Sequence, residues 1–148
     1  MKKYLPWVLA LFVAFVFIQS LFFKFTGSEE TVIIFSTLGE WMKRIGLPTR
    51  LADGFAAHGG IIIGSAELIA SILILVPKTR IVGAIMGFFI MSGAIFFHLF
   101  TPLGVNRVID EQGNTDGGVL FFMACGVWLC CLILIFLNRH VFLRKQLS

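Results

Sequence analysis

Glu67 is the residue in this sequence with the clearest capacity for chemistry. It lies in a long apolar stretch, residues 53–76, about 20 Å of helix rise from its start. A carboxylate so deep in a membrane costs at least about 2.5–3.5 kcal/mol, so it should face a helix bundle and have a partner. Gly60, Gly64 and Ser71 share its helical face. Two interpretations stay open: a proton, ligand or quinone site, or a packing carboxylate with a fixed partner.

Lys24, near the end of the first apolar stretch, is a candidate partner for Glu67 because its ammonium has the opposite charge. Its ammonium either rises along the helix to the membrane interface or turns inward and neutralises Glu67. The axial gap between the two residues is large. An inward pair would therefore be bridged by water or by Gln19, which lies at a depth close to that of Glu67.

Two histidines lie near the same end of their apolar stretches. His98 shares its helical face with small residues, so it should point inward, as a hydrogen-bonding residue or as a group that handles a ligand or a proton. His58 lies about 180° around its helix from Glu67. A histidine pair at similar depth can ligate haem, but nothing else indicates a haem cavity. We therefore expect no metal site.

The composition indicates the kind of molecule that positions these side chains. The chain has 148 residues, of which 58% are hydrophobic and only 14% charged, with a mean hydropathy of +0.96. Soluble domains carry about 25% charged residues. An ordinary soluble enzyme, a disordered chain and a disulfide-bonded miniprotein are thereby excluded. Three cysteines lie in one apolar stretch without a CxxC motif, which argues against a disulfide framework or zinc.

Four stretches are long enough to span a bilayer: residues 4–25, 53–76, 79–100 and 116–137. Each should be a helix, because a helix satisfies its own backbone hydrogen bonds in hydrocarbon. The first stretch is long for a cleaved signal peptide and no A-x-A site follows it. The expected fold is an all-α membrane protein, an antiparallel bundle of four transmembrane helices that forms one domain over residues 1–148.

The loop between the first two spans should hold a further, amphipathic helix. Its apolar residues recur at helical spacing, and they are Ile34, Leu38, Trp41, Met42 and Ile45. This pattern is typical of a helix lying in the membrane interface. Gly46-Leu47-Pro48 should end it, and Asp53 should cap the second span. Residues 101–115, rich in Gly, Asn and Asp, read as a turn.

Basic residues predict the orientation. One end of the bundle carries seven basic residues and no acid: Lys2, Lys3, Lys78, Arg80, Arg139, Arg144 and Lys145. The other end carries five basic residues and seven acids. Both termini should therefore be cytoplasmic, in a bacterial inner membrane. The net charge of +4 is dispersed in such clusters, without the continuous basic face that nucleic-acid binding needs.

Two GxxxG motifs, Gly60 to Gly64 and Gly83 to Gly87, are typical of close helix packing. In a four-helix protein we expect them to serve packing within one chain. A homodimer formed through such faces is the alternative.

Several short motifs together resemble the DoxX family of small four-helix membrane proteins. The similarity covers about Leu5 to Arg139 and lies in these segments: Phe22-Phe23-Lys24-Phe25-Thr26-Gly27, Gly46-Leu47-Pro48, Gly64-Ser65-Ala66-Glu67-Leu68-Ile69, the basic turn Lys78 to Arg80, Ala94 to His98, Leu103-Gly104, and Asp116-Gly117-Gly118-Val119-Leu120-Phe121. The resemblance implies Lys24, Glu67 and His98 as the polar positions of interest. It also implies a link to redox membranes, since some relatives are quinone-linked thiosulfate-oxidising subunits and others associate with oxidant-defence proteins.

Two functions follow as hypotheses. The first is a membrane subunit of a redox system that binds a quinone or another apolar ligand between its helices and contacts redox partners. The second is a non-catalytic scaffold, assembly factor or chaperone for other membrane proteins, as some distant DoxX relatives are. The chain has no CxxC, haem or nucleotide motif, so it would at most be an accessory subunit of an oxidoreductase. A proton-coupled transporter is less favoured, because residues 68–76 are almost wholly apolar.

The charge distribution generates a topological prediction. A reporter that is active only in the cytoplasm should be active when fused to either terminus, and one that is active only outside should be silent there. Activity of the second reporter at either terminus would contradict the predicted orientation.

Overall fold

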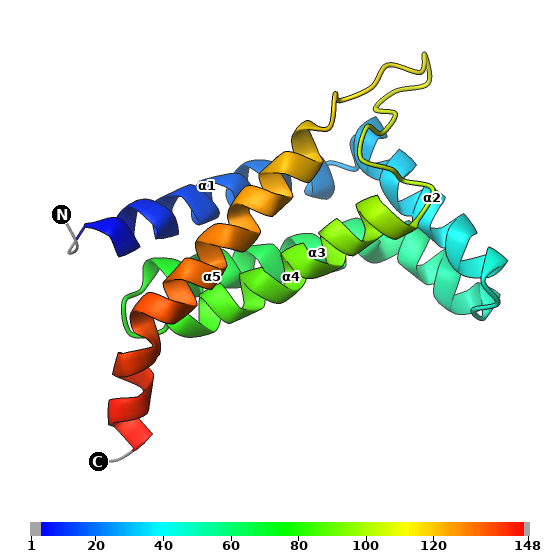
Figure 1. The fold of residues 1–148 in the computed structure, drawn as a ribbon. Helices are drawn as coiled ribbons and strands as arrows, with labels where there is room; N and C mark the ends of the chain where they lie inside the picture. The colour runs from blue at the N-terminus through cyan, green and yellow to red at the C-terminus, as the bar shows by residue number, and fades with distance from the viewer. Residues whose placement is uncertain (1–3, 147–148) are drawn as a thin grey trace.

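The protein is an all-α bundle in a computed structural model that describes residues 4–146, with side chains described as far as Arg139. The helices are α1 (Leu5–Phe25), α2 (Glu29–Arg44), α3 (Thr49–Leu75), α4 (Arg80–Phe100) and α5 (Val119–Gln146) (Figure 1). Four segments are long and apolar enough to cross a membrane: α1, α3, α4 and the part of α5 from Val119 to Arg139. The predicted four-span fold is confirmed. Lys2 and Lys3, and the side chains of Arg144 and Lys145, fall outside the described residues.

The four long helices form a ring in which each one packs mainly on two others. Among these four helices, contacts join α1 to α3, α3 to α4, α4 to α5 and α5 back to α1. Figure 1 shows α3 and α5 running back against the direction of α1 and α4. Every neighbouring pair is thus antiparallel. We call the end where α1 stops and α3 begins the loop end of the bundle.

Helix α2 confirms the predicted amphipathic helix and packs against α3 at the loop end. Ser28 caps it by accepting a hydrogen bond from the Thr31 amide at 3.3 Å. The helix buries Phe35 and Leu38, whereas Ile45, predicted on the same apolar face, is 54% exposed. Close approach to α3 depends on Gly39, where a Cβ would lie 3.0 Å from the Ala52 carbonyl oxygen.

Two helix boundaries differ from the sequence prediction. Helix α3 begins at Thr49 with Pro48 as its N-cap, so the prediction that Asp53 caps this helix is wrong. Proline has no amide hydrogen to leave unpaired and favours the start of a helix. Asp53 instead pairs with Lys43 of α2 at 2.7 Å. Hydrogen bonds from Lys43 to Asp53 and to Glu40 raise the pKa of that ammonium.

Helix α5 starts three residues after the predicted position. Asp116, predicted as the first residue of this span, precedes the helix and accepts hydrogen bonds from the amides of Gly118 at 2.9 Å and Leu120 at 3.2 Å. These bonds satisfy amides at the helix start that have no intrahelical partner. The helix also continues to Gln146, beyond the predicted end at residue 137.

Small residues set the distance between α3 and α4 within the bundle core. A Cβ on Gly83 would lie 2.5 Å from the amide nitrogen of Ile74 and 2.8 Å from the carbonyl oxygen of Ala70, both backbone atoms of α3. Gly87 similarly faces Cys131 of α5 and Phe17 of α1. Gly60 and Gly64 are buried as well. The GxxxG motifs therefore serve packing within the chain, as predicted.

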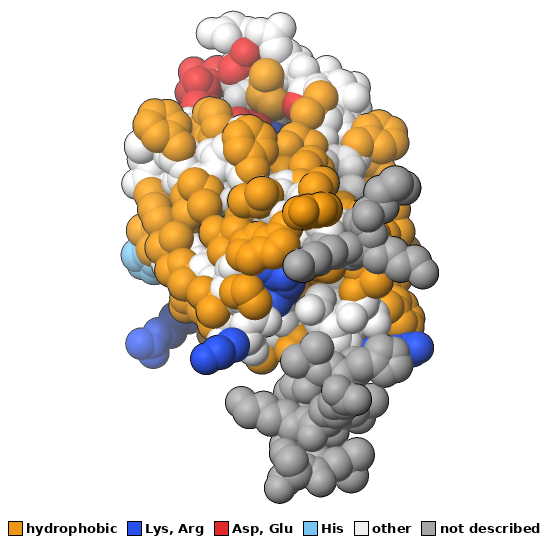
Figure 2. Space-filling model, turned by 90° about the vertical axis from the view of Figure 1, so that its left-hand side faces the viewer, with side chains coloured by type: hydrophobic (Ala, Val, Ile, Leu, Met, Phe, Trp, Pro, Cys, Tyr) orange, Lys and Arg blue, Asp and Glu red, His pale blue; other side chains and the backbone are white. Residues whose placement is uncertain are grey.

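Large apolar side chains cover the outside of the ring. Phe15, Phe89 and Phe122 are each about two-thirds exposed, as expected of side chains that face lipid. Figure 2 shows hydrophobic side chains over most of the visible face, with acidic side chains at the top and most Lys and Arg side chains lower down. Contact with a lipid bilayer follows from the four spans.

Gly83→Ala should destabilise the protein in detergent by about 1–3 kcal/mol, because the new methyl group meets backbone that cannot rotate away. Gly93→Ala is the matched control on the same helix, since a Cβ there meets nothing within 4 Å. Both can be measured by thermal or denaturant unfolding. Equal stability of the two variants would contradict the proposed contact between α3 and α4.

Candidate functional site

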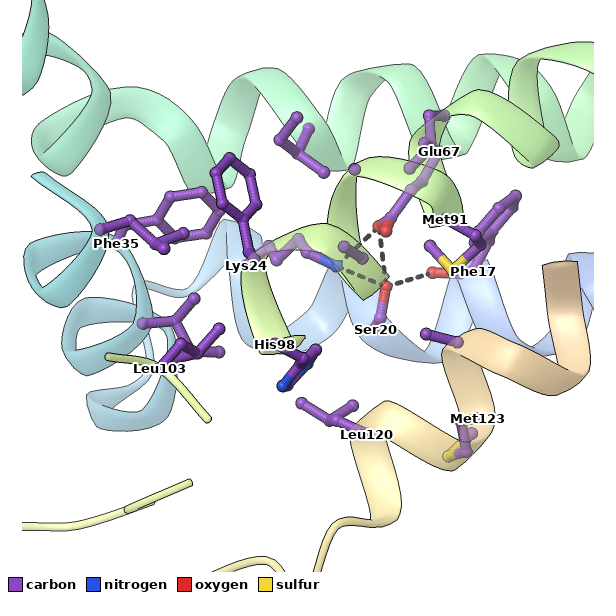
Figure 3. Close-up of a pocket in the computed structure, with 18 of the residues that line it drawn as sticks. Phe17, Ser20, Lys24, Phe35, Glu67, Met91, His98, Leu103, Leu120 and Met123 are labelled. Atoms are coloured by element: carbon purple, nitrogen blue, oxygen red, sulfur yellow. Dashed lines mark hydrogen bonds and ion pairs between the residues drawn. The ribbon is translucent and has the colours of Figure 1, made fainter. Parts of the chain in front are cut away.

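The bundle contains a partly open cavity of about 260 Å³ whose walls come from all five helices and from Leu103. The walls are almost entirely apolar, with Phe17, Phe35 and Met91 among them. Four polar side chains interrupt them, and these are Ser20, Lys24, Glu67 and His98 (Figure 3). Three of the residues singled out in the sequence therefore line one cavity.

Lys24 and Glu67 form a direct ion pair inside this cavity. The Lys24 Nζ lies 2.7 Å from Glu67 Oε2, and the Glu67 side chain is only 4% exposed. Of the two interpretations of Lys24, the structure shows the inward one. The expected bridge by water or Gln19 is wrong: the contact is direct.

The geometry of antiparallel helices explains how the pair closes the axial gap. Helical side chains lean toward the N-terminus of their own helix. On α1 that direction is away from the loop end, and on α3 it is toward the loop end. Lys24 and Glu67 consequently lean toward each other. Gly64, one turn from Glu67, packs against Leu21 and Phe25 and lets α1 approach closely.

Ser20 completes the polar group, and sequence reasoning missed it. Its hydroxyl accepts a hydrogen bond from Lys24 Nζ at 2.9 Å. The hydroxyl hydrogen has two acceptors in reach, Glu67 Oε2 at 2.9 Å and the Phe17 carbonyl oxygen at 2.8 Å. The available signal was its spacing, since Ser20 lies four residues before Lys24 and therefore on the same helical face.

Gln19 and His58 lie away from the cavity. Both are exposed on the outside of the ring, Gln19 on α1 and His58 on α3. Adjacent positions on a helix point about 100° apart, so Gln19 cannot share the direction of Ser20. The structure therefore does not bring these two candidates to the ion pair.

His98 is buried at the loop end of the cavity and is 7% exposed. Its Nδ1 lies 2.7 Å from the carbonyl oxygen of Gly104, and its ring meets Phe121 edge-on at 5.8 Å. Gly104 adopts φ +70°, a conformation that favours glycine and that presents its carbonyl to the histidine. His98 therefore links α4 to the segment that covers this end of the cavity.

That segment, residues 101–118, is more ordered than the predicted turn. Val108 and Thr115 form an antiparallel bridge, and Asp110 accepts hydrogen bonds from Asn114 that lower the pKa of the Asp110 carboxyl. Arg107 is its anchor, a side chain that is 1% exposed and that pairs with Glu30 of α2 and with Asp116. Sequence reasoning missed this anchor, because Glu30 lies 77 residues away in the chain.

The arrangement offers a ligand both donors and acceptors in an apolar space. An ammonium has three hydrogens, and Lys24 uses two of them on Glu67 and Ser20. Within the described part of the chain, Glu67 Oε1 and His98 Nε2 make no hydrogen bond. A polar head group entering the cavity can therefore be both oriented and hydrogen-bonded.

Comparisons of this chain with protein-family models, curated proteins and solved structures return no match.

Removal of one member of the ion pair should destabilise the bundle. Glu67→Leu leaves the Lys24 ammonium buried and unpaired, which we expect to cost about 3 kcal/mol in the free energy of unfolding. Glu67→Gln keeps a hydrogen-bond acceptor and should cost less. Lys24→Met combined with Glu67→Leu should recover most of the stability.

The matched control is the exposed pair between Lys43 and Asp53. Asp53→Leu should change the free energy of unfolding by less than about 1 kcal/mol. Unfolding in detergent measures all four variants. If Glu67→Leu were as stable as the wild type, the buried pair would have no structural role.

Arg107→Met should loosen residues 108–115 without unfolding the helices, because it removes the link to Glu30 and Asp116. Hydrogen exchange of the amides in this segment should accelerate at least about tenfold. Arg50→Met changes an exposed arginine and serves as the control. Unchanged exchange in the Arg107 variant would show that other contacts hold the segment.

Proposed function

We propose that this four-span membrane protein binds a quinone or a similar apolar ligand between its helices, as a non-autonomous subunit of a redox or oxidant-defence system. The observation that carries the proposal is the apolar cavity with the Lys24–Glu67–Ser20 group in its wall, in which Glu67 is buried and the other two side chains are partly buried. Pockets with apolar walls and a few convergent polar groups are the usual form of small-molecule sites.

The size of the cavity supports a head group in preference to a whole long-chain lipid. Pockets that hold drug-sized ligands measure about 300–1,000 Å³, and this cavity measures about 260 Å³. A single substituted ring fits that space, while an attached chain would extend between helices toward the lipid. The apolar outer surface of the ring of helices suits such a chain.

The polar group suits the oxygens of a quinone. Lys24 can donate its third hydrogen to a carbonyl oxygen, and its charge is balanced by Glu67 within 2.7 Å. The site can therefore hold a polar head group without an unbalanced charge in the membrane. The resemblance to the DoxX family, with its quinone-linked members, favours the same ligand class.

Purification in mild detergent, followed by mass spectrometry of extracted lipids and of proteins, tests the proposal. We expect the wild-type protein to retain a quinone or a comparable apolar ligand in a ratio near one per chain. The double variant Lys24→Met with Glu67→Leu should fold and lose that ligand, because both polar groups are gone. Gln19→Leu, on the outside of α1, should retain it.

Two outcomes would contradict the proposal. One is an empty wild-type protein that also fails to bind an added short-chain quinone. The other is a stoichiometric protein partner without any ligand, which would favour the alternative of a membrane scaffold or assembly factor.

A further inference from the structure

We propose that His98 selects a ligand that carries a hydroxyl group, so that the cavity binds a hydroquinone more tightly than the matching quinone. This inference rests on the proposed function and specifies which form of the ligand the site prefers. It is carried by the hydrogen-bonding state of one buried imidazole.

The contact with Gly104 fixes which nitrogen of His98 holds a hydrogen. A carbonyl oxygen can only accept, so Nδ1, 2.7 Å from it, must be the donor. In a neutral imidazole the other nitrogen, Nε2, is then an acceptor. Among the described residues no carboxylate forms an ion pair with the His98 ring.

The side chain that carries the free acceptor is part of the cavity wall. The His98 ring lines it, and no described residue donates a hydrogen bond to Nε2. Figure 3 draws no hydrogen bond or ion pair between His98 and the Lys24–Glu67–Ser20 group. Because no described residue donates to Nε2, a hydrogen-bonding partner for it has to come from a ligand or water.

A hydroxyl group and a carbonyl group differ at this nitrogen. A hydroquinone hydroxyl donates a hydrogen bond to Nε2, whereas a quinone carbonyl places an oxygen lone pair against the nitrogen lone pair. Lys24 can donate to an oxygen of either form and so does not separate them. Glu67 Oε1, like His98 Nε2, can accept a hydrogen bond from a hydroxyl and not from a carbonyl. His98 is then a second determinant of specificity, apart from the ion pair, and the segment around Gly104 sets its tautomer.

Decyl-p-benzoquinone and its hydroquinone are the probes, because the two have nearly equal size and the same chain. Their dissociation constants are measured by calorimetry under anaerobic conditions in lipid nanodiscs. We expect the wild-type protein to bind the hydroquinone about threefold to tenfold more tightly. His98→Asn should retain a donor for Gly104, while its shorter side chain places no acceptor where Nε2 lies, so the preference should fall while quinone binding stays.

His58→Asn is the control, because His58 is exposed on the outer side of α3. It should keep the wild-type preference. Melting of each variant in the nanodisc shows whether His98→Asn is folded, and His98→Gln, which offers its own acceptor toward the cavity, provides a second test with partial recovery of the preference.

The outcomes separate this inference from the proposed function. Equal binding of both probes by the wild-type protein, or an undiminished preference in His98→Asn, overturns the role of His98 and leaves the quinone site standing. Binding of neither probe to the wild-type protein overturns the proposed function and this inference with it.

Discussion

The buried ion pair between Lys24 and Glu67 is the constraint to which the rest of the bundle conforms. Two opposite charges in an apolar interior are tolerable only when they meet directly. Their contact fixes how far α1 can slide or rotate against α3. Glycines on α3 and α4 then fit the remaining helices around this fixed pair at close range. The cavity lies beside the pair, so the interaction that sets the helix register also supplies the polar part of the candidate site.

The loop end shows a second use of paired charges, outside the spans. Neighbouring residues of α2, Glu29 and Glu30, hold the segment 101–118 by accepting from the Glu111 amide and from Arg107. The same segment positions the carbonyl that orients His98. Helix α2 therefore contributes to the cavity in two ways, with apolar wall residues such as Phe35 and through the segment that its first turn anchors. Helix α2 thus helps to form the site although it lies at a distance from the ion pair.

The sequence predicted those features that depend on one helix at a time. Hydropathy located the four spans and helical spacing located α2, because both are properties of local composition. The inward face of Glu67 followed from the cost of burying charge and from the small residues beside it. Features that depend on two helices were harder. To predict that Ser20 and not Gln19 contacts Glu67, one must know how α1 is rotated against α3. To predict the role of Arg107, one must know where Glu30 lies. The cavity itself is a property of the assembled ring.

The order of Lys24 and Glu67 along the chain has a consequence for biosynthesis. Helix α1 leaves the ribosome before α3, so the lysine is already in the membrane when the glutamate arrives. The carboxylate can thus be neutralised as its helix enters, and it need never face lipid alone. A circularly permuted chain that began with α3 would have the same folded contacts but would present Glu67 to the insertion machinery without its counterion. The direction of synthesis, and not only the final packing, therefore lowers the energetic cost of placing a charge at this depth of the bundle.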